Sequence, residues 1–134
     1  MQGTAINEQQ LNAVIGELRL CDSIETAYLL GSAVAERLRP DSDVDIAVLC
    51  RGAGHLPVEE RLRLAGRLAA VLGRPVDLGV LSISNVVYAK EAIATGRLIF
   101  ERDHRVTARF AMLSLSMYAS LQEARREVLR AYAA

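Results

Sequence analysis

The sequence predicts an α/β fold: a small mixed sheet flanked by helices and followed by a long C-terminal helix. Apolar residues recur at helical spacing in some segments and form short strand-like runs in four others. The two kinds of segment alternate along the chain, which is typical of helices packed on a sheet. Because 134 residues suffice for one hydrophobic core, we expect a single domain over 1–134, with its core at about 22–103.

The first half of the chain alternates helices and strands. Asn7 and Gln10 resemble the capping pair of a helix, and apolar residues at helical spacing follow. Gly31 ends the first apolar strand, and Pro40 stops the short helix after it. Apolar residues then alternate from Val44 onward. These signals predict a helix at 8–20, a strand at 24–30, a short helix at 33–38 and a strand at 44–50.

The second half repeats this alternation after a glycine-containing loop. Pro57 can open a helix and Gly73 can end it. Ser84 can cap the next helix and Gly96 can end it. These signals predict a loop at 51–57, a helix at 58–72, a strand at 74–81, a helix at 85–95, an edge strand at 97–101 and a helix at about 104–133. On the helix at 58–72, three arginines are expected on the solvated face: Arg61, Arg63 and Arg67.

The last helix carries more apolar surface than one sheet can cover. Its apolar residues form two stripes, namely Phe110, Leu113 and Met117, and Met112, Leu115 and Tyr118. One interpretation is an interface through which the helix joins a partner or a second copy, giving a hetero- or homo-oligomer. The other is that a small domain wraps the helix deeply. The sequence leaves both open.

Composition and charge exclude several classes of protein. The 16 basic and 16 acidic side chains balance, so no net charge favours non-specific binding to nucleic acid or to an anionic membrane, and we expect neither as a direct partner. The N-terminal segment lacks the basic and apolar regions of a signal peptide, and no apolar run approaches the roughly 20 residues that span a bilayer. Cys21 and Cys50 lack metal-site spacing and are expected to be reduced thiols. We therefore expect a cytoplasmic protein.

Two aspartates stand one residue apart where the strand at 44–50 begins. Alternate residues of a strand lie about 6.6 Å apart on the same side, so Asp43 and Asp45 converge. Asp77, on the strand at 74–81, joins them if the two strands are neighbours. Clustered carboxylates repel one another unless a cation offsets their charge, and oxygen ligands with an incomplete shell suit Mg²⁺. A solvated turn after Pro40 would explain any one aspartate, whereas the three together favour a metal site.

Gly31 and Ser32 lie at the turn from the first strand to the short helix. Outward-pointing backbone N–H groups at such a turn can bind phosphate, glycine allows close approach, and serine adds a hydroxyl donor. A Gly-Ser pair alone would indicate only a turn. Ten residues before an Asp-x-Asp strand, it predicts that a phosphate and a metal ion meet.

This pattern resembles a known signature. Gly31-Ser32, ten intervening residues and Asp43-x-Asp45 resemble the GSx10DxD motif of the DNA polymerase β-like nucleotidyltransferase superfamily. "RPDSDVDIAVL" is similar to the minimal nucleotidyltransferase (MNT) proteins, antitoxins of prokaryotic toxin–antitoxin pairs whose toxin is a HEPN-domain ribonuclease. "GRPVDLGVL" and "GRLIFERD" are similar to the strand of the third carboxylate and to the closing strand of the family, so the likeness spans about 24–103.

The resemblance implies a nucleotidyltransferase fold and an enzyme that transfers AMP from ATP to a tyrosine of a HEPN toxin, releasing pyrophosphate. The implied catalytic residues, which would also hold two Mg²⁺ ions, are Asp43, Asp45 and Asp77. The implied nucleotide-binding residues are Gly31, Ser32, Ser42 and Arg39.

The chain departs from the family pattern GSxARG. Ala35 replaces the basic residue, and Glu36 replaces the second glycine and adds a negative charge near the expected triphosphate. This should weaken nucleotide binding unless Arg37 or Arg39 compensates. Two alternatives therefore stay open: a catalytically weakened protein that neutralises the toxin by binding, and a transferase that acts on a small molecule such as an aminoglycoside.

Overall fold

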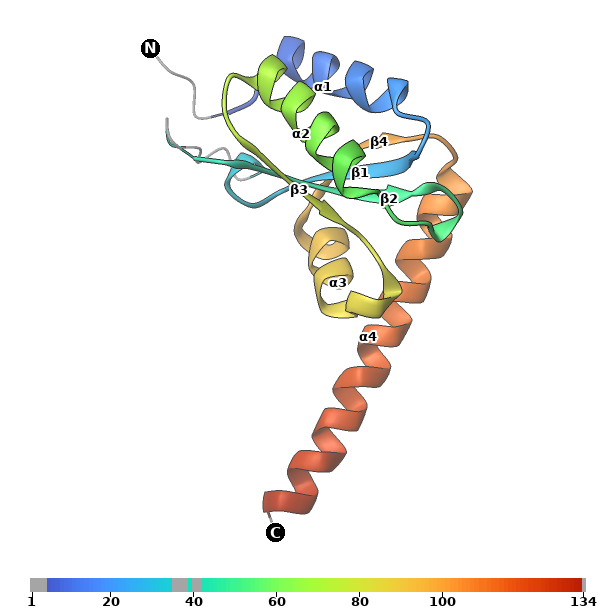
Figure 1. Ribbon diagram of the computed structural model, residues 1–134. Coiled ribbons are helices and arrows are strands. Elements are labelled where there is room, and N and C mark those ends of the chain that lie inside the picture. The colour runs from blue at the N-terminus through green and yellow to red at the C-terminus, as the bar shows by residue number, and fades with distance from the viewer. Residues whose placement is uncertain (1–4, 35–38, 40–41, 134) are drawn as a thin grey trace.

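The computed structural model describes residues 5–34, 39 and 42–133 and shows a four-stranded mixed sheet with helices on both faces (Figure 1). The helices are α1 (Glu8–Leu20), α2 (Val58–Leu72), α3 (Val86–Thr95) and α4 (His104–Ala133). The strands are β1 (Ile24–Leu30), β2 (Val44–Cys50), β3 (Val76–Val80) and β4 (Arg97–Glu101). Three short 3₁₀ helices connect them: η1 (Gly31–Ala33), η2 (Arg51–Ala53) and η3 (Ile83–Asn85). The predicted α/β fold and long C-terminal helix are confirmed.

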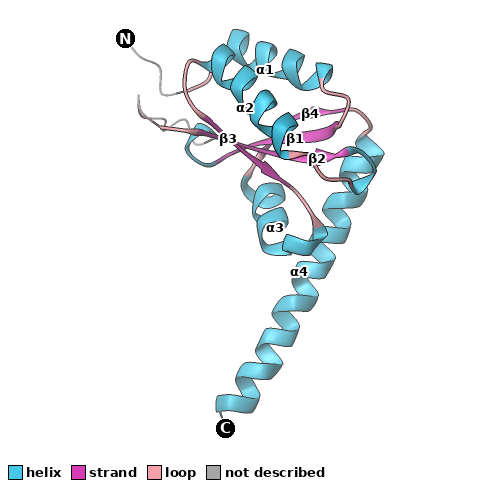
Figure 2. Cartoon of the chain, viewed as in Figure 1, coloured by secondary structure: helices cyan, strands magenta, loops and turns pink. Residues whose placement is uncertain are grey.

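The strands lie in the order β3-β2-β1-β4. β1 is antiparallel to both β2 and β4, whereas β2 and β3 are parallel and are joined by the crossover through α2. α1 and α2 cover one face of the sheet, and α3 with the first turns of α4 covers the other (Figure 2). β4 and β3 are thus the two edge strands. β2 and β3 are neighbours, which is the condition under which the sequence predicts that Asp77 joins Asp43 and Asp45.

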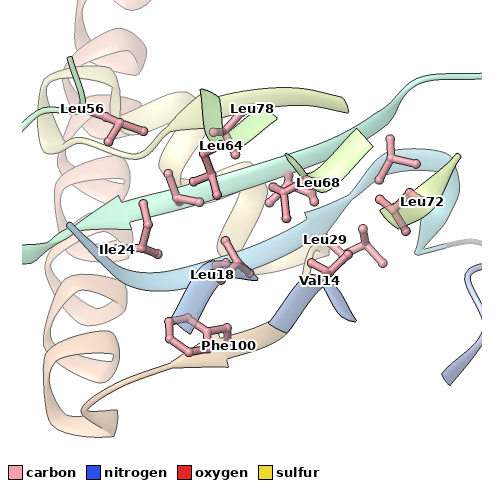
Figure 3. Close-up of a cluster of buried hydrophobic side chains, with 14 of the residues drawn as sticks. Val14, Leu18, Ile24, Leu29, Leu56, Leu64, Leu68, Leu72, Leu78 and Phe100 are labelled. Carbon is pink, nitrogen blue, oxygen red and sulfur yellow. The ribbon is translucent and has the colours of Figure 1, made fainter. Parts of the chain in front are cut away.

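The main core fills the space between the sheet and the pair α1 and α2 (Figure 3). Val44, Ile46 and Val48 of β2 face this core, and Leu64 and Leu68 of α2 pack onto them without any exposed surface. Because side chains alternate along a strand, the odd-numbered residues of β2 point to the opposite face, toward α3.

A smaller apolar cluster lies on that opposite face. It contains Ala47 and Leu49 of β2, Tyr28 of β1, and Ala92 of α3. This cluster covers the second half of β2, so the beginning of the strand, at Asp45, stays only half-buried on the α3 face. The site residues therefore lie where the sheet is least covered.

α4 is attached to the sheet at its beginning and leaves it further on (Figure 1). The hydroxyl oxygens of Thr26 on β1 and Thr107 on α4 are 2.9 Å apart in a buried hydrogen bond. Beyond Gln122, the described residues of the helix are all exposed. Met112, on one of the two apolar stripes, is 73% exposed, so the interpretation that the domain wraps this helix deeply is wrong.

Most element boundaries agree with the sequence predictions. The capping pair Asn7 and Gln10 forms the expected reciprocal hydrogen bonds. The strand predicted at 74–81 is shorter, and the cap of α3 is Asn85 rather than Ser84, because the Asn85 side chain accepts a hydrogen bond from the Tyr88 backbone. The sequence predicts a short helix at 33–38. The structure has η1 at Gly31–Ala33 with Val34 as its C-cap, and 35–38 lie outside the described residues.

Within the described part of the chain, no helix combines the length and the apolar character that crossing a membrane requires.

Candidate active site

The parallel pairing of β2 with β3 places two of the predicted site residues side by side. Asp45 and Asp77 are direct partners in the register of the two strands. Asp77 lies at the exposed edge, and Asp45 is half-buried next to it. Asp43 precedes β2 by one residue, is exposed, and lies close enough for its charge to act on Asp45. The structure thus brings the three aspartates to one end of the sheet.

Gly31 borders the same carboxylate cluster from β1. Leu30 is the register partner of Asp45, and Gly31 follows it with a φ of +64°, a conformation that glycine adopts without strain. A Cβ added at Gly31 would lie 3.3 Å from Oδ2 of Asp45, so a side chain here would crowd the carboxylate. The absence of a side chain keeps backbone and carboxylate next to each other, as a shared phosphate and metal site requires.

The other predicted nucleotide-binding residues lie in η1 and in the turn before Asp43. Ser32 is part of η1. Ser42 and Arg39 form a turn: the Arg39 N–H donates to Oγ of Ser42 at 2.9 Å, and the Ser42 N–H donates to the Arg39 carbonyl at 3.0 Å. Arg74 donates to the same carbonyl at 2.6 Å. Ser42 therefore has a local role in closing the turn. Ala35, Glu36 and Arg37, where the chain departs from the family pattern, lie outside the described residues.

The carboxylate cluster has no compensating basic partner among the described residues, whose ion pairs do not include Asp43, Asp45 or Asp77. Burial, and then the charges of Asp77 and Asp43, raise the pKa of Asp45 above its ordinary value. The described acidic, histidine and cysteine side chains nowhere close around one point in a group of three or more. The aspartates are thus an open set of oxygen donors whose repulsion a hard divalent cation would relieve, which fits Mg²⁺.

Replacing Asp45 with asparagine is expected to stabilise the protein when no divalent cation is present. A raised pKa means that the folded state holds the Asp45 proton more tightly than the unfolded state. The free energy of unfolding therefore falls as the pH rises from the unfolded pKa to the folded one. Asparagine carries no charge and removes the loss. Urea unfolding at pH 7 in a chelator should give a higher midpoint for the variant than for the wild type.

The advantage of Asp45→Asn should shrink as the pH is lowered toward about 4, where the carboxyl becomes protonated in both states. The same substitution at the exposed Asp22, which is remote from the cluster in the sequence, serves as the control and should change little. A variant that is less stable than the wild type at pH 7 would contradict an unfavourable charge at Asp45.

The sequence does not predict the contacts of two residues near the cluster. Tyr88 of α3 lies over Gly79 of β3, two residues after Asp77, and burial followed by the charges of Asp77 and Asp45 raises its pKa. Arg61 of α2 donates from Nε to the Leu78 carbonyl at 2.7 Å. Neither contact has a local sequence signal, because each depends on how a helix packs against a separate strand.

The prediction of a solvated arginine face on α2 is confirmed for Arg61 and Arg63, which are both exposed. Arg61 nevertheless also donates to the edge of β3. Arg67 is half-buried and forms an ion pair with Glu17 of α1 at 3.3 Å. The spacing of arginines along a helix shows which side they share, but not whether a neighbouring element reaches that side.

Comparison with known proteins places this geometry in context. Residues 12–105 match the family described as polymerase beta, nucleotidyltransferase. The protein adenylyltransferase MntA of Shewanella oneidensis is 32% identical over 108 residues, which cover 79% of this chain and 74% of the relative.

Two solved structures extend the likeness to nearly the whole chain. One is the tri-AMPylated HEPN toxin of Shewanella oneidensis in complex with MNT antitoxin, with a TM-score of 0.73 and 28% identity. The other is a toxin–antitoxin with AMP-PNP, with a TM-score of 0.72 and 26% identity. Each match covers 96% of this chain and 100% of the other. The fit therefore includes α4 as well as the sheet.

Proposed function

This chain belongs to the polymerase β-like nucleotidyltransferase family and is a homologue of the adenylyltransferase antitoxin MntA, and we propose that it transfers AMP from ATP to a tyrosine of a HEPN toxin. The toxin partner and the modification are suggested by the homologous complex, in which the toxin is tri-AMPylated. The use of ATP is supported by the homologous structure with AMP-PNP. Because both ATP and the RNA substrates of a ribonuclease toxin are cytoplasmic, we place the reaction in the cytoplasm.

One observation carries this proposal: Asp77 of β3, Asp45 of β2 and Gly31, the residue directly after β1, lie in a row across the sheet. Leu30 pairs with Asp45, and Asp45 pairs with Asp77. Such a row can hold the triphosphate at the Gly31 end and present the acceptor hydroxyl at the Asp77 end. In-line displacement at a phosphorus atom needs these two groups on opposite sides.

In the proposed reaction, the acceptor tyrosine oxygen bonds to the α-phosphorus of ATP. The bond from the α-phosphorus to the bridging oxygen of the β-phosphate breaks, and pyrophosphate leaves. The carboxylate of Asp77 takes the tyrosine proton. Backbone N–H groups at Gly31 and Ser32 hold the triphosphate in place, with Ser42 and Arg39 in the adjoining turn. Orientation of the two reactants by these groups supplies much of the rate enhancement.

Asp43, Asp45 and Asp77 would hold the Mg²⁺ ions. When bound, these ions offset the charge of the phosphates and of the attacking and leaving oxygens. The carboxylates are suited to this task because none of them forms an ion pair with a basic side chain among the described residues.

Incubation of the protein with ATP, Mg²⁺ and the product of the neighbouring gene, followed by intact-mass measurement, tests the proposed function. We expect the partner to gain one or more AMP groups and to lose its ribonuclease activity. A partner that is inhibited without any gain in mass would support the weakened protein that acts by binding alone. A partner that is neither modified nor inhibited would refute both.

We further propose that the toxin docks on the exposed apolar surface of α4. Val128 and Leu129 lie beyond the last contact of the helix with the sheet and line a shallow apolar surface with Ala124 and Arg125. The alignment with a chain of the homologous toxin–antitoxin complex spans 96% of this chain and so includes most of this helix. A surface that buries several apolar side chains upon association is typical of a stable interface.

Leu129→Asp is expected to weaken binding of the toxin by at least about 10-fold, because truncating and charging an interface anchor costs more than about 1.4 kcal/mol. Leu129 is 68% exposed, so the fold itself should be unaffected. Arg130→Asp places an aspartate at an exposed position on the opposite side of the same helix and is the matched control. Titration by isothermal calorimetry measures both. Equal affinities for the two variants would place the interface elsewhere.

A further inference from the structure

Two side chains contact the edge strand β3 immediately after Asp77. One comes from each of the two helix layers. Arg61 reaches it from α2 and Tyr88 from α3, and we call this pair the β3 clamp. α2 and α3 lie on opposite faces of the sheet (Figure 1). The clamp therefore joins both layers of helices to the strand that carries the proposed general base.

β3 needs such support more than the other strands of the site. It has only five residues and, among the described strands, pairs with β2 alone. Asp77 is the second of these residues and is exposed. Edge strands with few contacts open at a lower free energy than central ones. A displacement of this strand would move Asp77 relative to Asp45, on the central strand β2, and to Gly31, directly after the central strand β1.

Arg61 supports the strand at its free edge. Its Nε donates to the Leu78 carbonyl at 2.7 Å, in a partly buried hydrogen bond across 17 residues. Charge-assisted hydrogen bonds of this length are among the stronger ones. The acceptor belongs to the residue directly after Asp77, so this bond restrains β3 one peptide unit beyond the proposed base.

Tyr88 contacts the strand from the face of the sheet that α3 covers. The end of its side chain lies so close to Gly79 that a Cβ added there would come within 2.9 Å of Cζ, so a larger residue would force the tyrosine to move. Gly79 and Asp77 are alternate residues and share that face. Burial and the charges of Asp77 and Asp45 raise the pKa of Tyr88, and the charge of Arg61 opposes this rise, so both members of the clamp lie near the cluster.

We propose that Arg61 and Tyr88 are positioning residues that hold Asp77 in register with Asp45 during AMP transfer. This inference rests on the proposed function and deepens it. The clamp acts on the general base, whereas the triphosphate is held at the other end of the row. Loss of either side chain should therefore lower kcat and leave the KM for ATP nearly unchanged.

The Arg61 half is tested with two variants of the same position. Arg61→Met keeps the length and removes the donor, and we expect kcat for AMP transfer to fall about 10- to 100-fold, the loss that a small misplacement of a reacting group causes. Arg61→Lys restores a donor and should recover most of this loss. Arg63→Met, on the exposed side of the same helix, is the matched control and should match the wild type.

The Tyr88 half is tested by separating the ring from its hydroxyl. Tyr88→Phe keeps the ring over Gly79 and should retain kcat within about 3-fold, whereas Tyr88→Ala should lower it about 10- to 100-fold. Amide hydrogen exchange over residues 76–80 gives a readout independent of activity. It should be faster in Arg61→Met and Tyr88→Ala than in the wild type, with α1 and β1 unchanged.

Each outcome has a distinct meaning. If the wild type transfers no AMP, the proposed function fails, although faster exchange of 76–80 in the variants would still support the clamp. If the wild type is active and Arg61→Met and Tyr88→Ala keep its kcat, or lose only thermal stability, the positioning role is refuted. A rise in the KM for ATP with unchanged kcat would assign the two residues to nucleotide binding instead and would also refute it.

Discussion

Replacing Asp43 or Asp45 with asparagine is expected to lower the rate of AMP transfer by about 1,000-fold or more while the protein stays folded. Each substitution removes a charged oxygen donor from a cluster that has two others. Charge stabilisation of phosphoryl groups by a bound cation amounts to several kcal/mol, which corresponds to this factor. The measurement is the initial rate of AMP incorporation into the partner at saturating ATP and Mg²⁺.

The direction of the stability change makes this prediction specific. Asp45→Asn should be at least as stable as the wild type, because it relieves the repulsion that raises the pKa of Asp45. A loss of activity that came from unfolding would appear instead as a lower midpoint. Asp22→Asn, at an exposed turn, should keep full activity. An active Asp45→Asn protein would show that the carboxylate pair is not the metal site.

Leu68→Ala is expected to have the largest effect on stability, lowering the free energy of unfolding by about 2–5 kcal/mol. Leu68 has 0% exposure and packs between α2 and the sheet, where the removed atoms leave a cavity that close-packed neighbours fill only in part (Figure 3). The total stability of a domain of this size is about 5–15 kcal/mol, so the loss is a large share of it. Urea unfolding at 25 °C measures the difference.

Leu62→Ala on the same helix is the matched control. Leu62 is 68% exposed, so the same change of residue should cost no more than about 0.5 kcal/mol. Equal losses at the two positions would contradict the orientation of α2 on the sheet.

Local signals in the sequence predicted most elements because each depends on neighbouring residues. The capping pair Asn7 and Gln10 and the left-handed Gly73 at the end of α2 act within one turn of chain. The cap of α3 was misassigned to Ser84, because Ser84 and Asn85 are both favourable cap residues. The backbone of η3 decides between them: Ser82 caps the 3₁₀ turn, and Asn85 caps the helix.

The candidate site was predicted in part. The spacing of Gly31 from Asp43 and Asp45 is visible in the sequence, and strand alternation assigns the aspartates to one side. The register that pairs Asp45 with Asp77 depends on how β2 and β3 align, which no local pattern states. The contacts of Arg61 and Tyr88 with β3 have no local signal, because they depend on how α2 and α3 pack against that strand.

The sequence by itself determined the class of the fold and the order of the elements, since periodicity, caps and motif spacing are local properties of the chain. Only the tertiary structure decided which carboxylates meet, which arginine reaches an edge strand and which part of α4 stays uncovered. The physical reason is that burial and strand register depend on contacts between distant segments. The sequence predicts that the three aspartates form a site, but it does not predict the neighbouring residues that hold them in place.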